Sequence, residues 1–338
     1  MNTPFLRALP RNAVFARARF TQPHLALLAM TFTLALAPSN VLACGVCNAT
    51  LNSDWASQGY TVGPGIRIDL RHDNYTQDQQ RRGTSKADPA DLAIPNADEI
   101  QHTTRNRVTT LGIDYSPSYA WGLDIQLPWV DRFHDTYDAG ETDLSSSHSQ
   151  SIGDLRITAR YQGFAANSRT GVQFGLKLPT GATDELFLEG PVAGEPLDRG
   201  LQPGTGSTDL LLGAFRYGSH GEKIGWFMQA QGQAPLTSHD AFRPGASLTT
   251  TFGVRLLNAQ RIVPQLQLNA RIEGRESGAN ADRDNSGAQR IFISPGINLK
   301  VNHRLGGYVF VQFPLYQHVN GLQIEPASLL SAGLHYRL

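Results

Sequence analysis

Cysteine, net charge and long apolar runs are scarce in this sequence, and each shortage excludes a class of protein or site. Only two of the 338 residues are cysteine, and both belong to one Cys-x-x-Cys pair, so a four-cysteine zinc site cannot form. The formal net charge is +0, which favours neither nucleic acid nor an anionic surface as a partner. No segment after residue 43 holds about 18 uninterrupted apolar residues, which excludes a helical membrane protein.

The first 43 residues are predicted to be a secretory signal peptide. Four arginines precede an apolar core over 25–37, and Val41-Leu42-Ala43 supplies small or apolar residues for cleavage. The core is too short to span a membrane. The end of this segment also resembles a lipobox, which would make Cys44 a lipidated residue, although Leu42 is unusual before its Ala-Cys. We expect ordinary cleavage, with lipidation as the alternative, and a chain that leaves the cytosol.

Alternation of apolar and polar residues dominates the rest of the chain. It is clear in the segments 65–73, 121–130, 154–163, 171–179 and 265–274. In the last of these, one face of an extended chain would carry Leu266, Leu268, Ala270 and Ile272, and the other would carry Gln267, Asn269, Arg271 and Glu273. Alternation with period 2 predicts strands that have one apolar and one strongly polar face.

The spacing of these strands predicts a transmembrane barrel. The connections alternate between roughly 31, 17, 27, 11, 14 and 13 residues on one side and about two to five on the other, which is the layout of an outer-membrane barrel. We therefore predict an all-β, transmembrane antiparallel β-barrel of about 12 strands over residues 60–338, with both termini periplasmic. The predicted strands lie near 60–72, 104–115, 121–133, 151–164, 170–179, 207–218, 224–235, 247–258, 262–274, 289–302, 305–314 and 328–338.

The last predicted strand supports the barrel because its apolar stripe ends on the final residue. In SLLSAGLHYRL the stripe consists of Leu330, Ala332, Leu334, Tyr336 and Leu338. A strand of this kind closes onto the first strand of a barrel and is recognised by the assembly machinery of the outer membrane, which we expect as a partner beside outer-membrane lipid. Outer-membrane barrels usually end in Phe, and Leu338 departs from that pattern.

Barrel geometry assigns the two faces of the strands. The apolar stripe must face lipid, so the polar residues point into the lumen. Because the inward charges have both signs, we expect them to pair internally. The candidates for lining the lumen are Arg67, Asp69, Arg71, Asp124, Arg156, Arg160, Lys177, Arg271, Glu273 and Lys300. Aromatic residues at strand ends are expected to form girdles at the membrane surfaces, namely Tyr60, Trp121, Trp129, Phe133, Tyr217, Trp226 and Tyr308.

The segment 177–215 carries a recognisable motif, in which LPTG ends one strand and QPGTGSTDLLLG opens the next. It resembles a family of bacterial outer-membrane barrels first associated with phenol degradation, the MetA-pathway family, which are described as transporters of hydrophobic compounds. The resemblance implies a β-barrel in the bacterial outer membrane that passes a small-molecule permeant. The matching residues are Leu178, Pro179, Thr180, Gly181, Pro203, Gly204, Thr205, Gly206 and Asp209.

The CGVC pair lies in a segment, 44–59, between the signal and the barrel. A c-type haem would need histidine where Asn48 stands, and a thioredoxin-like site would need a βαβ setting. Three hypotheses remain: a disulfide between Cys44 and Cys47, lipid on Cys44, or a soft metal such as copper bound by the pair. No other cofactor is expected. The segment is also a candidate plug of the lumen, with Trp55 as its anchor.

Two other motifs were weighed as sites. A barrel lipid hydrolase would need His148 and a serine on one face, but Ser149 and Ser151 lie at odd spacings from it and would face the other way. The loop GANADRDNSG (278–287) alternates hard-cation ligands but lacks the closing Glu of a calcium loop, so we expect a solvated loop.

The sequence therefore favours a passive outer-membrane channel or transporter for small, hydrophobic or aromatic compounds, with no enzymatic activity. The first alternative is a closed, structural barrel with a metal-binding or disulfide-forming CGVC pair at its periplasmic mouth. About twelve strands is close to the width that side chains can still fill, which keeps this alternative open. The third hypothesis is the lipid hydrolase.

Overall fold

The computed structural model describes residues 58–59, 64–164, 169–257 and 261–338. All described residues belong to a single compact unit. The predictions for the signal peptide, for Cys44 and Cys47 with their disulfide, lipid or copper, and for Trp55 and Tyr60 lie outside the described residues.

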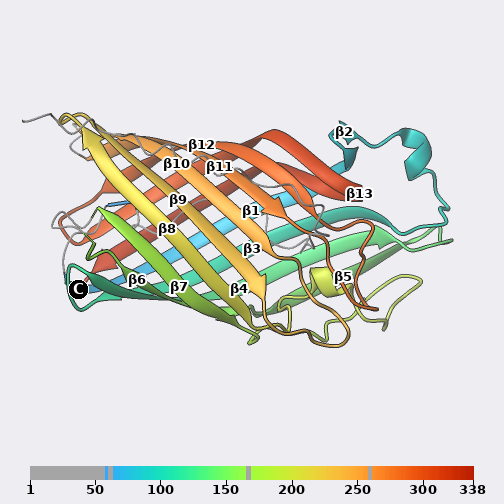
Figure 1. Ribbon diagram of the computed structural model, residues 1–338. Helices are drawn as coiled ribbons and strands as arrows, with labels where there is room; N and C mark the ends of the chain where they lie inside the picture. Colours follow the sequence, from blue (N-terminus) through green and yellow to red (C-terminus); the bar gives the residue numbers. More distant parts are fainter. Residues whose placement is uncertain (1–57, 60–63, 165–168, 258–260) are drawn as a thin grey trace, which may run out of the picture. The chain divides into compact units, whose positions relative to one another are not determined.

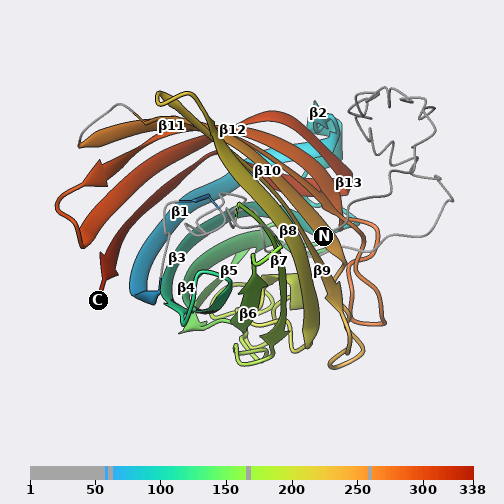
Figure 2. The same cartoon turned by 60° about the vertical axis from the view of Figure 1, so that its left-hand side comes forward.

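The described chain forms one antiparallel sheet that closes into a barrel (Figures 1 and 2). Neighbouring strands pair in sequence order, and β13 pairs with β1 to close the sheet. The strands are β1 (Gly65–Gly83), β2 (Ser85–Lys86), β3 (Ile100–Ser116), β4 (Trp121–Tyr137), β5 (Leu144–Ile152), β6 (Leu155–Tyr161), β7 (Thr170–Leu178), β8 (Asp209–His220), β9 (Ile224–Pro235), β10 (Ser247–Leu256), β11 (Ile262–Glu273), β12 (Ala288–Lys300) and β13 (Leu305–Arg337).

β13 is itself a hairpin. Its first part pairs with β12 and its second part with β1. The two parts lie side by side, because the carbonyl oxygen of Gly333 lies 3.2 Å from the position that a Cβ on Gly307 would occupy. The chain reverses at Asn320-Gly321, between residues that pair with β12 and with β1, and Gly321 has φ 57°, a left-handed conformation that glycine adopts readily. β2 is only an extension, and β5 and β6 both pair with β4, so the described strands make twelve passes. The prediction of about 12 strands is confirmed.

The connections differ in length between the two ends of the barrel. Short turns follow β3, β8, β10 and β12, and the longer segments 84–99, 179–208, 236–246 and 274–287 lie at the other end, which we call the outer mouth. Three predicted loops were too long. The first was expected to contain roughly 31 residues, but β1 extends to Gly83 and β3 begins at Ile100, so this loop is 84–99. The last two passes are joined by two residues rather than by about 13, and β4 and β5 extend until only 138–143 separates them.

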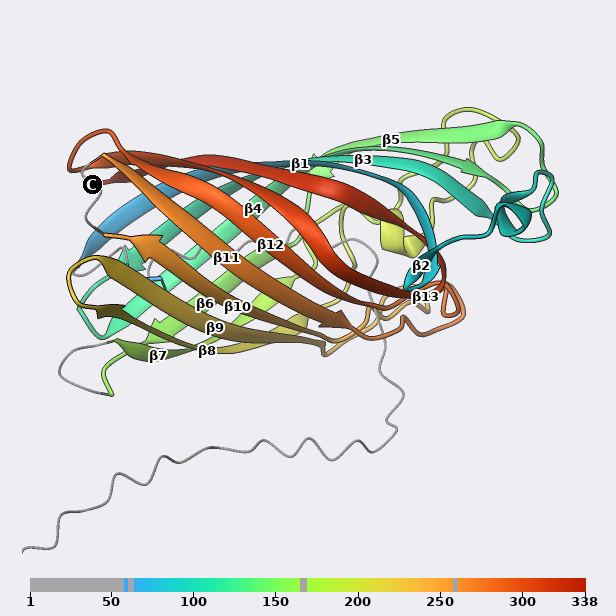
Figure 3. The same cartoon turned by 90° about the horizontal axis from the view of Figure 1, so that it is seen from above.

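Long strands raise one side of the wall beyond the others (Figure 3). β1, β3 and β4 contain 19, 17 and 17 residues, whereas about 9–11 suffice to cross a membrane. On β1 the outward residues change from Ile68 and Leu70 to His72 and Asn74, so the apolar band ends there. On β4 the band lies between Trp121 and Trp129, which are both exposed as the aromatic girdle predicts.

Burial is inverted relative to a soluble protein. The exposed side chains include rows of Leu, Ile and Phe such as Leu266, Leu268 and Ile272, whereas Gln267, Asn269 and Arg271 between them are buried. In a closed barrel the exposed face is the outer one, so the apolar stripe faces outward and the polar one inward.

The helical content of the described residues is limited to two 3-10 turns, η1 (Pro89–Leu92) and η2 (Arg199–Leu201). No helix among the described residues has the length and apolar character needed to cross a membrane. η2 lies within the segment 179–208, at the outer mouth.

Candidate functional site

Opposite charges pair on the inner face of β1, β3 and β6. Asp114 accepts a hydrogen bond from Arg160 at 2.9 Å, and an Arg67 nitrogen lies 3.7 Å from its other oxygen. All three side chains are buried. Buried charges are tolerated where they are paired, so this cluster fixes three strands to one another across the lumen side of the wall.

A second cluster joins β11, β12 and β13. Arg290 donates to both oxygens of Glu325 at 2.9 and 3.0 Å and also contacts Glu273, which in turn accepts from Arg271 at 2.8 Å. Arg290 is 2 % exposed, and the bidentate contact is the geometry in which an Arg–carboxylate pair is strongest. The predicted internal pairing is therefore present in the interior of the barrel.

The ten charged residues predicted to line the lumen all occupy the inward register of their strands, although their surroundings differ. Buried and paired are Arg67, Arg160, Lys177, Arg271 and Glu273. Partly exposed are Asp69, Arg71, Asp124 and Arg156, and Lys300 is exposed at the end of β12. Sequence reasoning missed Asp114, Arg290 and Glu325; Asp114 could have been found, because it alternates with Ile113 and Tyr115.

The motif of the segment 177–215 converges on Lys177. Its ammonium nitrogen lies 2.9 Å from Asp154 and 3.1 Å from Asp209, and it also contacts the hydroxyls of Thr205 and Ser207. Lys177 is 4 % exposed. Asp154 was missed by sequence reasoning, although Gly153-Asp154 interrupts the alternation between Ile152 and Leu155 and so marked the place where β5 gives way to β6.

The two halves of the motif also touch through their backbones. A Cβ on Gly181 would lie 2.6 Å from Cα of Gly204, and a Cβ on Gly204 would lie 2.4 Å from the carbonyl oxygen of Gly181. The Thr180 hydroxyl donates to the Gly153 carbonyl and accepts from Leu155 N–H, each at 2.9 Å. The glycines are therefore required by close backbone approach, and the motif closes the two ends of the segment 179–208 against the wall.

Between these ends, the segment 179–208 reaches across the outer mouth. Arg132, an inward residue of β4, donates to the carbonyls of Leu201 and Gln202. Gln202 is buried and donates to the carbonyls of Glu185 and Leu197 at 2.9 and 3.1 Å. These contacts hold η2 against the inner wall, so the segment narrows this end of the barrel.

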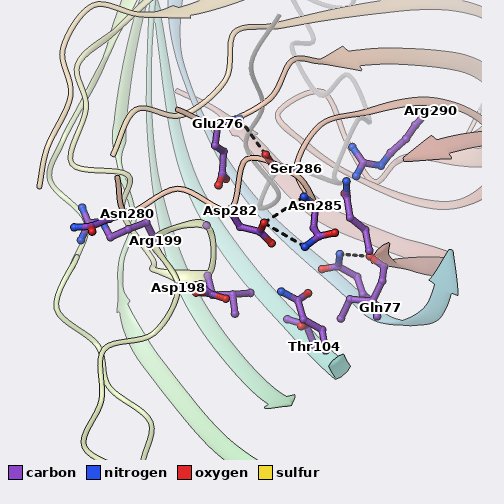
Figure 4. A pocket seen from close by; sticks show the side chains of 15 residues that line it. Gln77, Thr104, Asp198, Arg199, Glu276, Asn280, Asp282, Asn285, Ser286 and Arg290 are labelled. Carbon is purple, nitrogen blue, oxygen red and sulfur yellow. Dashed lines mark hydrogen bonds between the residues drawn. The ribbon is translucent and has the colours of Figure 1, made fainter. Parts of the chain in front are cut away.

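A small polar cavity lies where η2 meets the strands (Figure 4). It encloses about 70 Å³ and is lined by η2, by the loop 274–287 and by β1 and β3. Asp198 and Asp282 point into the same space, which Gln77 and Thr104 border from the strands. Binding sites for organic molecules usually measure about 300 Å³ or more, so this cavity suits water or small ions.

Aromatic rings line part of the inner wall, and two of them correct the girdle prediction. Tyr217 and Tyr308 were expected at the membrane surface, but both are buried on the inward face. Tyr217 packs with Phe215 and Phe227, and Tyr308 with Phe310. The rings of Phe227 and Phe310 occupy the space beside Gly253 and Gly296 of neighbouring strands, because a Cβ there would lie 2.2 and 2.1 Å from ring atoms. An aromatic ring that occupies the space left by the missing side chain of a glycine packs against the strand that carries that glycine.

In the serine-rich strand β5, the histidine and the serines next to it face opposite sides of the wall. His148 points outward and pairs with Asp131 at 2.8 Å, whereas Ser147 and Ser149 are buried on the opposite face. In the loop 278–287, Asp282 accepts from the backbone and side chain of Asn285, each at 3.2 Å. Within the part of the chain that the structure describes, no group of three or more His, Cys, Asp or Glu residues is placed to hold a metal ion.

The end of the segment 44–59 is described at Gln58 and Gly59. Gln58 is buried and accepts from Gln265, an inward residue near the start of β11, at 3.1 Å. A Cβ on Gly59 would lie 2.4 Å from the ring of Tyr217. These two residues therefore lie inside the barrel, near the end that carries the short turns.

A closed antiparallel barrel with an apolar outer face and paired charges inside is an outer-membrane β-barrel. Among solved structures, the COG4313 outer membrane channel from Pseudomonas putida F1 is similar, with a TM-score of 0.59 and 15 % identity over 82 % of this chain and 96 % of that chain. At this identity the likeness establishes a shared fold.

Two further channels give weaker matches. The CymD monoaromatic hydrocarbon channel has a TM-score of 0.42 at 8 % identity, over 86 % of this chain and 94 % of that chain. The Pseudomonas putida toluene transporter TodX has a TM-score of 0.41 at 10 % identity, over 88 % of this chain and 95 % of that chain. No family model and no curated protein matches the chain, so the resemblance to the phenol-degradation barrels stays a prediction.

Proposed function

We propose that this protein is a passive channel of the bacterial outer membrane for small, hydrophobic or aromatic compounds. The observation that carries the proposal is the barrel interior. Its inward face combines paired charges with buried aromatic rings, namely Phe215, Tyr217 and Phe227 near one end and Tyr308 and Phe310 on β13. Aromatic faces bind apolar and aromatic solutes by burial and by stacking, and paired charges keep the interior hydrated without attracting one ionic sign.

The alternative is a closed barrel with a structural role. It is favoured by the burial of inward side chains such as Gln267, Asn269 and Gln312, each 0 % exposed. Side chains that lined an open pore would contact solvent, and the inward aromatic rings are covered to the same degree, at most 9 % exposed, so passage of a solute would require the interior to open. In this alternative, the segment 44–59, with Gln58 hydrogen-bonded inside the barrel, would be a permanent plug rather than a gate.

Single-channel conductance of the refolded protein in a planar bilayer tests the proposal, beside a variant that lacks residues 44–59. Steady current in the intact protein would support a channel, and current confined to the truncated form would make the segment a plug. Uptake of toluene and of a hydrophilic solute of similar size into vesicles then tests the preference for aromatic compounds. Folded protein without current or uptake in either form would leave the structural barrel as the better explanation.

A further inference from the structure

The charges of this protein are distributed unevenly along the barrel, although the formal net charge is +0. The longer segments at the outer mouth are acidic. Counting Asp and Glu against Lys and Arg, 84–99 has four and one, 138–143 three and none, 179–208 five and one, 236–246 one and one, and 274–287 three and two. The outer mouth therefore carries sixteen acidic residues and five basic ones.

Arginine neutralises part of the acidic charge at the outer mouth. Arginine side chains lie 3.0, 3.8 and 3.6 Å from Asp91, Asp240 and Asp284. By contrast, Asp184, Glu189 and Glu195 are exposed on the segment that crosses the mouth, and none of them forms an ion pair with another described residue. The crossing segment therefore presents negative charge to a solute that approaches from this side.

The end of the barrel with the short turns, which we call the inner mouth, is basic. Its connections contain one acidic residue against four basic ones, namely Glu222 against Arg169, Lys223, Arg261 and Arg304. All five side chains are exposed.

Two further cations, Lys300 and Arg337, extend the basic rim of the inner mouth along β12 and β13. The Lys300 N–H donates to the Arg261 carbonyl at 2.7 Å, and the Arg337 N–H donates to the Arg304 carbonyl at 2.8 Å. Both Lys300 and Arg337 occupy the inward register of their strands. Among the described residues, no carboxylate forms an ion pair with any of these four cations.

The wall between the two mouths does not cancel this separation. Of its three buried clusters, that of Asp114 has one excess positive charge, that of Lys177 has one excess negative charge, and that of Arg290 has none. The apolar band of such a barrel is about 25 Å tall, whereas the field of a charge in 0.1 M salt decays over about 10 Å. A solute would therefore meet the two mouths one after the other.

We propose that the two mouths are charge filters of opposite sign, which make the channel selective for uncharged compounds. This inference rests on the proposed channel function and names its substrate class. A cation is attracted by the acidic outer mouth and repelled by the basic inner mouth, and an anion meets the reverse order. An uncharged aromatic compound is repelled at neither mouth, so it passes more easily than an ammonium or carboxylate compound of the same size.

Filters of opposite sign also predict a current that depends on the direction of the voltage. When the outer side is positive, potassium enters at the acidic mouth and chloride at the basic mouth, so each ion enters where it is concentrated. Under the opposite voltage, each ion must enter at the mouth that repels it. The current should therefore be larger with the outer side positive in 0.1 M salt, and symmetric in 1 M salt, where the field decays within about 3 Å.

Single-channel recordings of the refolded protein and of neutralised variants test the filters. The outer variant combines Asp184→Asn, Glu189→Gln and Glu195→Gln, and the inner variant combines Lys300→Gln and Arg304→Gln. Both variants should show a weaker dependence on the direction of the voltage. Reversal potentials under a salt gradient should shift toward chloride in the outer variant and toward potassium in the inner variant, because each variant loses the filter that repels that ion.

Asp78→Asn and Arg216→Gln are the matched controls for these recordings. Both residues are exposed on the outward face of their strands, so their charges lie outside the lumen. Neither substitution should change the reversal potential or the dependence on voltage direction.

The charge of each mouth can also be measured without a current. Ala193→Cys places a thiol between exposed acidic residues of the crossing segment, and Val301→Cys places one between Lys300 and Arg304. Relative to a free thiol in 0.01 M salt, a cationic thiosulfonate should modify the first thiol about tenfold faster than an anionic one, and the second about tenfold more slowly. Both ratios should approach one in 1 M salt. The natural protein gives the background from its own cysteines.

The two measurements separate this inference from the proposed function. Opposite reagent preferences at the two mouths, together with a current that depends on voltage direction, would support the filters and the channel. Opposite preferences in a protein without current, both intact and lacking residues 44–59, would support the charged mouths and count against the channel. Equal reagent ratios at the two mouths, or a symmetric current in 0.1 M salt, would overturn the filters.

Discussion

The ammonium nitrogen of Lys177 lies 2.9 Å from a carboxylate oxygen of Asp154, although the two residues are separated by 23 positions in the sequence. Asp154 occupies the break between β5 and β6, and Lys177 lies next to the last residue of β7. Their contact therefore joins the irregular pass of the wall to the start of the segment that crosses the outer mouth. Both residues are buried, so each is needed to neutralise the other.

Replacing Lys177 by methionine should destabilise the barrel. The substitution keeps most of the side-chain volume but leaves the buried carboxylates of Asp154 and Asp209 without their cation, which costs about 3–5 kcal/mol in comparable buried pairs. Urea unfolding in lipid vesicles, followed by tryptophan fluorescence, would measure the loss. Lys300→Met, on the same inward register but exposed, should unfold like the natural protein. Equal midpoints for the two variants would contradict the assigned role of Lys177.

Alanine at Gly204 should loosen the crossing segment. Its Cβ would stand 2.4 Å from the Gly181 carbonyl oxygen, so one of two backbones must move, and overpacking of this kind costs about 1–3 kcal/mol. Limited proteolysis of the folded protein should then cut within 183–202 faster than in the natural protein. Gly232→Ala is the control, because the nearest atoms to its Cβ are 3.8 Å away, an ordinary contact. Faster cleavage in both variants would show that the effect is not specific to the motif.

Arginine in place of Leu268 should impair folding into a bilayer. Leu268 is exposed on the outward face of β11, within the apolar band, where arginine costs about 2–4 kcal/mol at the middle of the membrane. The fraction folded in vesicles can be read from heat-modifiable mobility on gels. Gln150→Arg, also outward but beyond the apolar band on β5, should fold normally. Tolerance of arginine at Leu268 would place that side chain outside the lipid.

Neutralising Asp114 should shift the ionic selectivity of the open channel toward anions. Asp114→Asn leaves Arg67 and Arg160 without their shared carboxylate, so the inner wall gains net positive charge. A charge about 8 Å from a passing ion changes its energy by about 0.5 kcal/mol in water, with opposite sign for chloride and potassium, which corresponds to about a fivefold change in the ratio of their permeabilities. Reversal potentials under a salt gradient would measure it. Asp78→Asn, an exposed outward residue of β1, should leave the ratio unchanged.

The alternation of residues was sufficient to predict most of the wall. In β11 the outward Leu266 and Leu268 and the inward Gln267 and Asn269 follow directly from period 2, because successive side chains of a strand point to opposite faces. The loop lengths then predicted the barrel and its twelve passes. The ends of the strands were predicted less well than the alternation. Around the Asn320-Gly321 turn, a loop was predicted from the sequence where the structure has a continuous hairpin.

Side-chain partners depended on register and could not be predicted. Arg160 meets Asp114 because β3 and β6 both flank β4, and Arg132 meets Leu201 because the segment 179–208 returns across the mouth. Tyr217 and Tyr308 were predicted to lie at the membrane surface because they are near strand ends. Both occupy positions of their strands that face inward, so they are buried inside the barrel. The sequence by itself determined the fold class and the polarity of the two faces, because both follow from local periodicity. Only the tertiary structure decided which charges pair and which segment crosses the mouth, because those contacts join residues far apart in the chain.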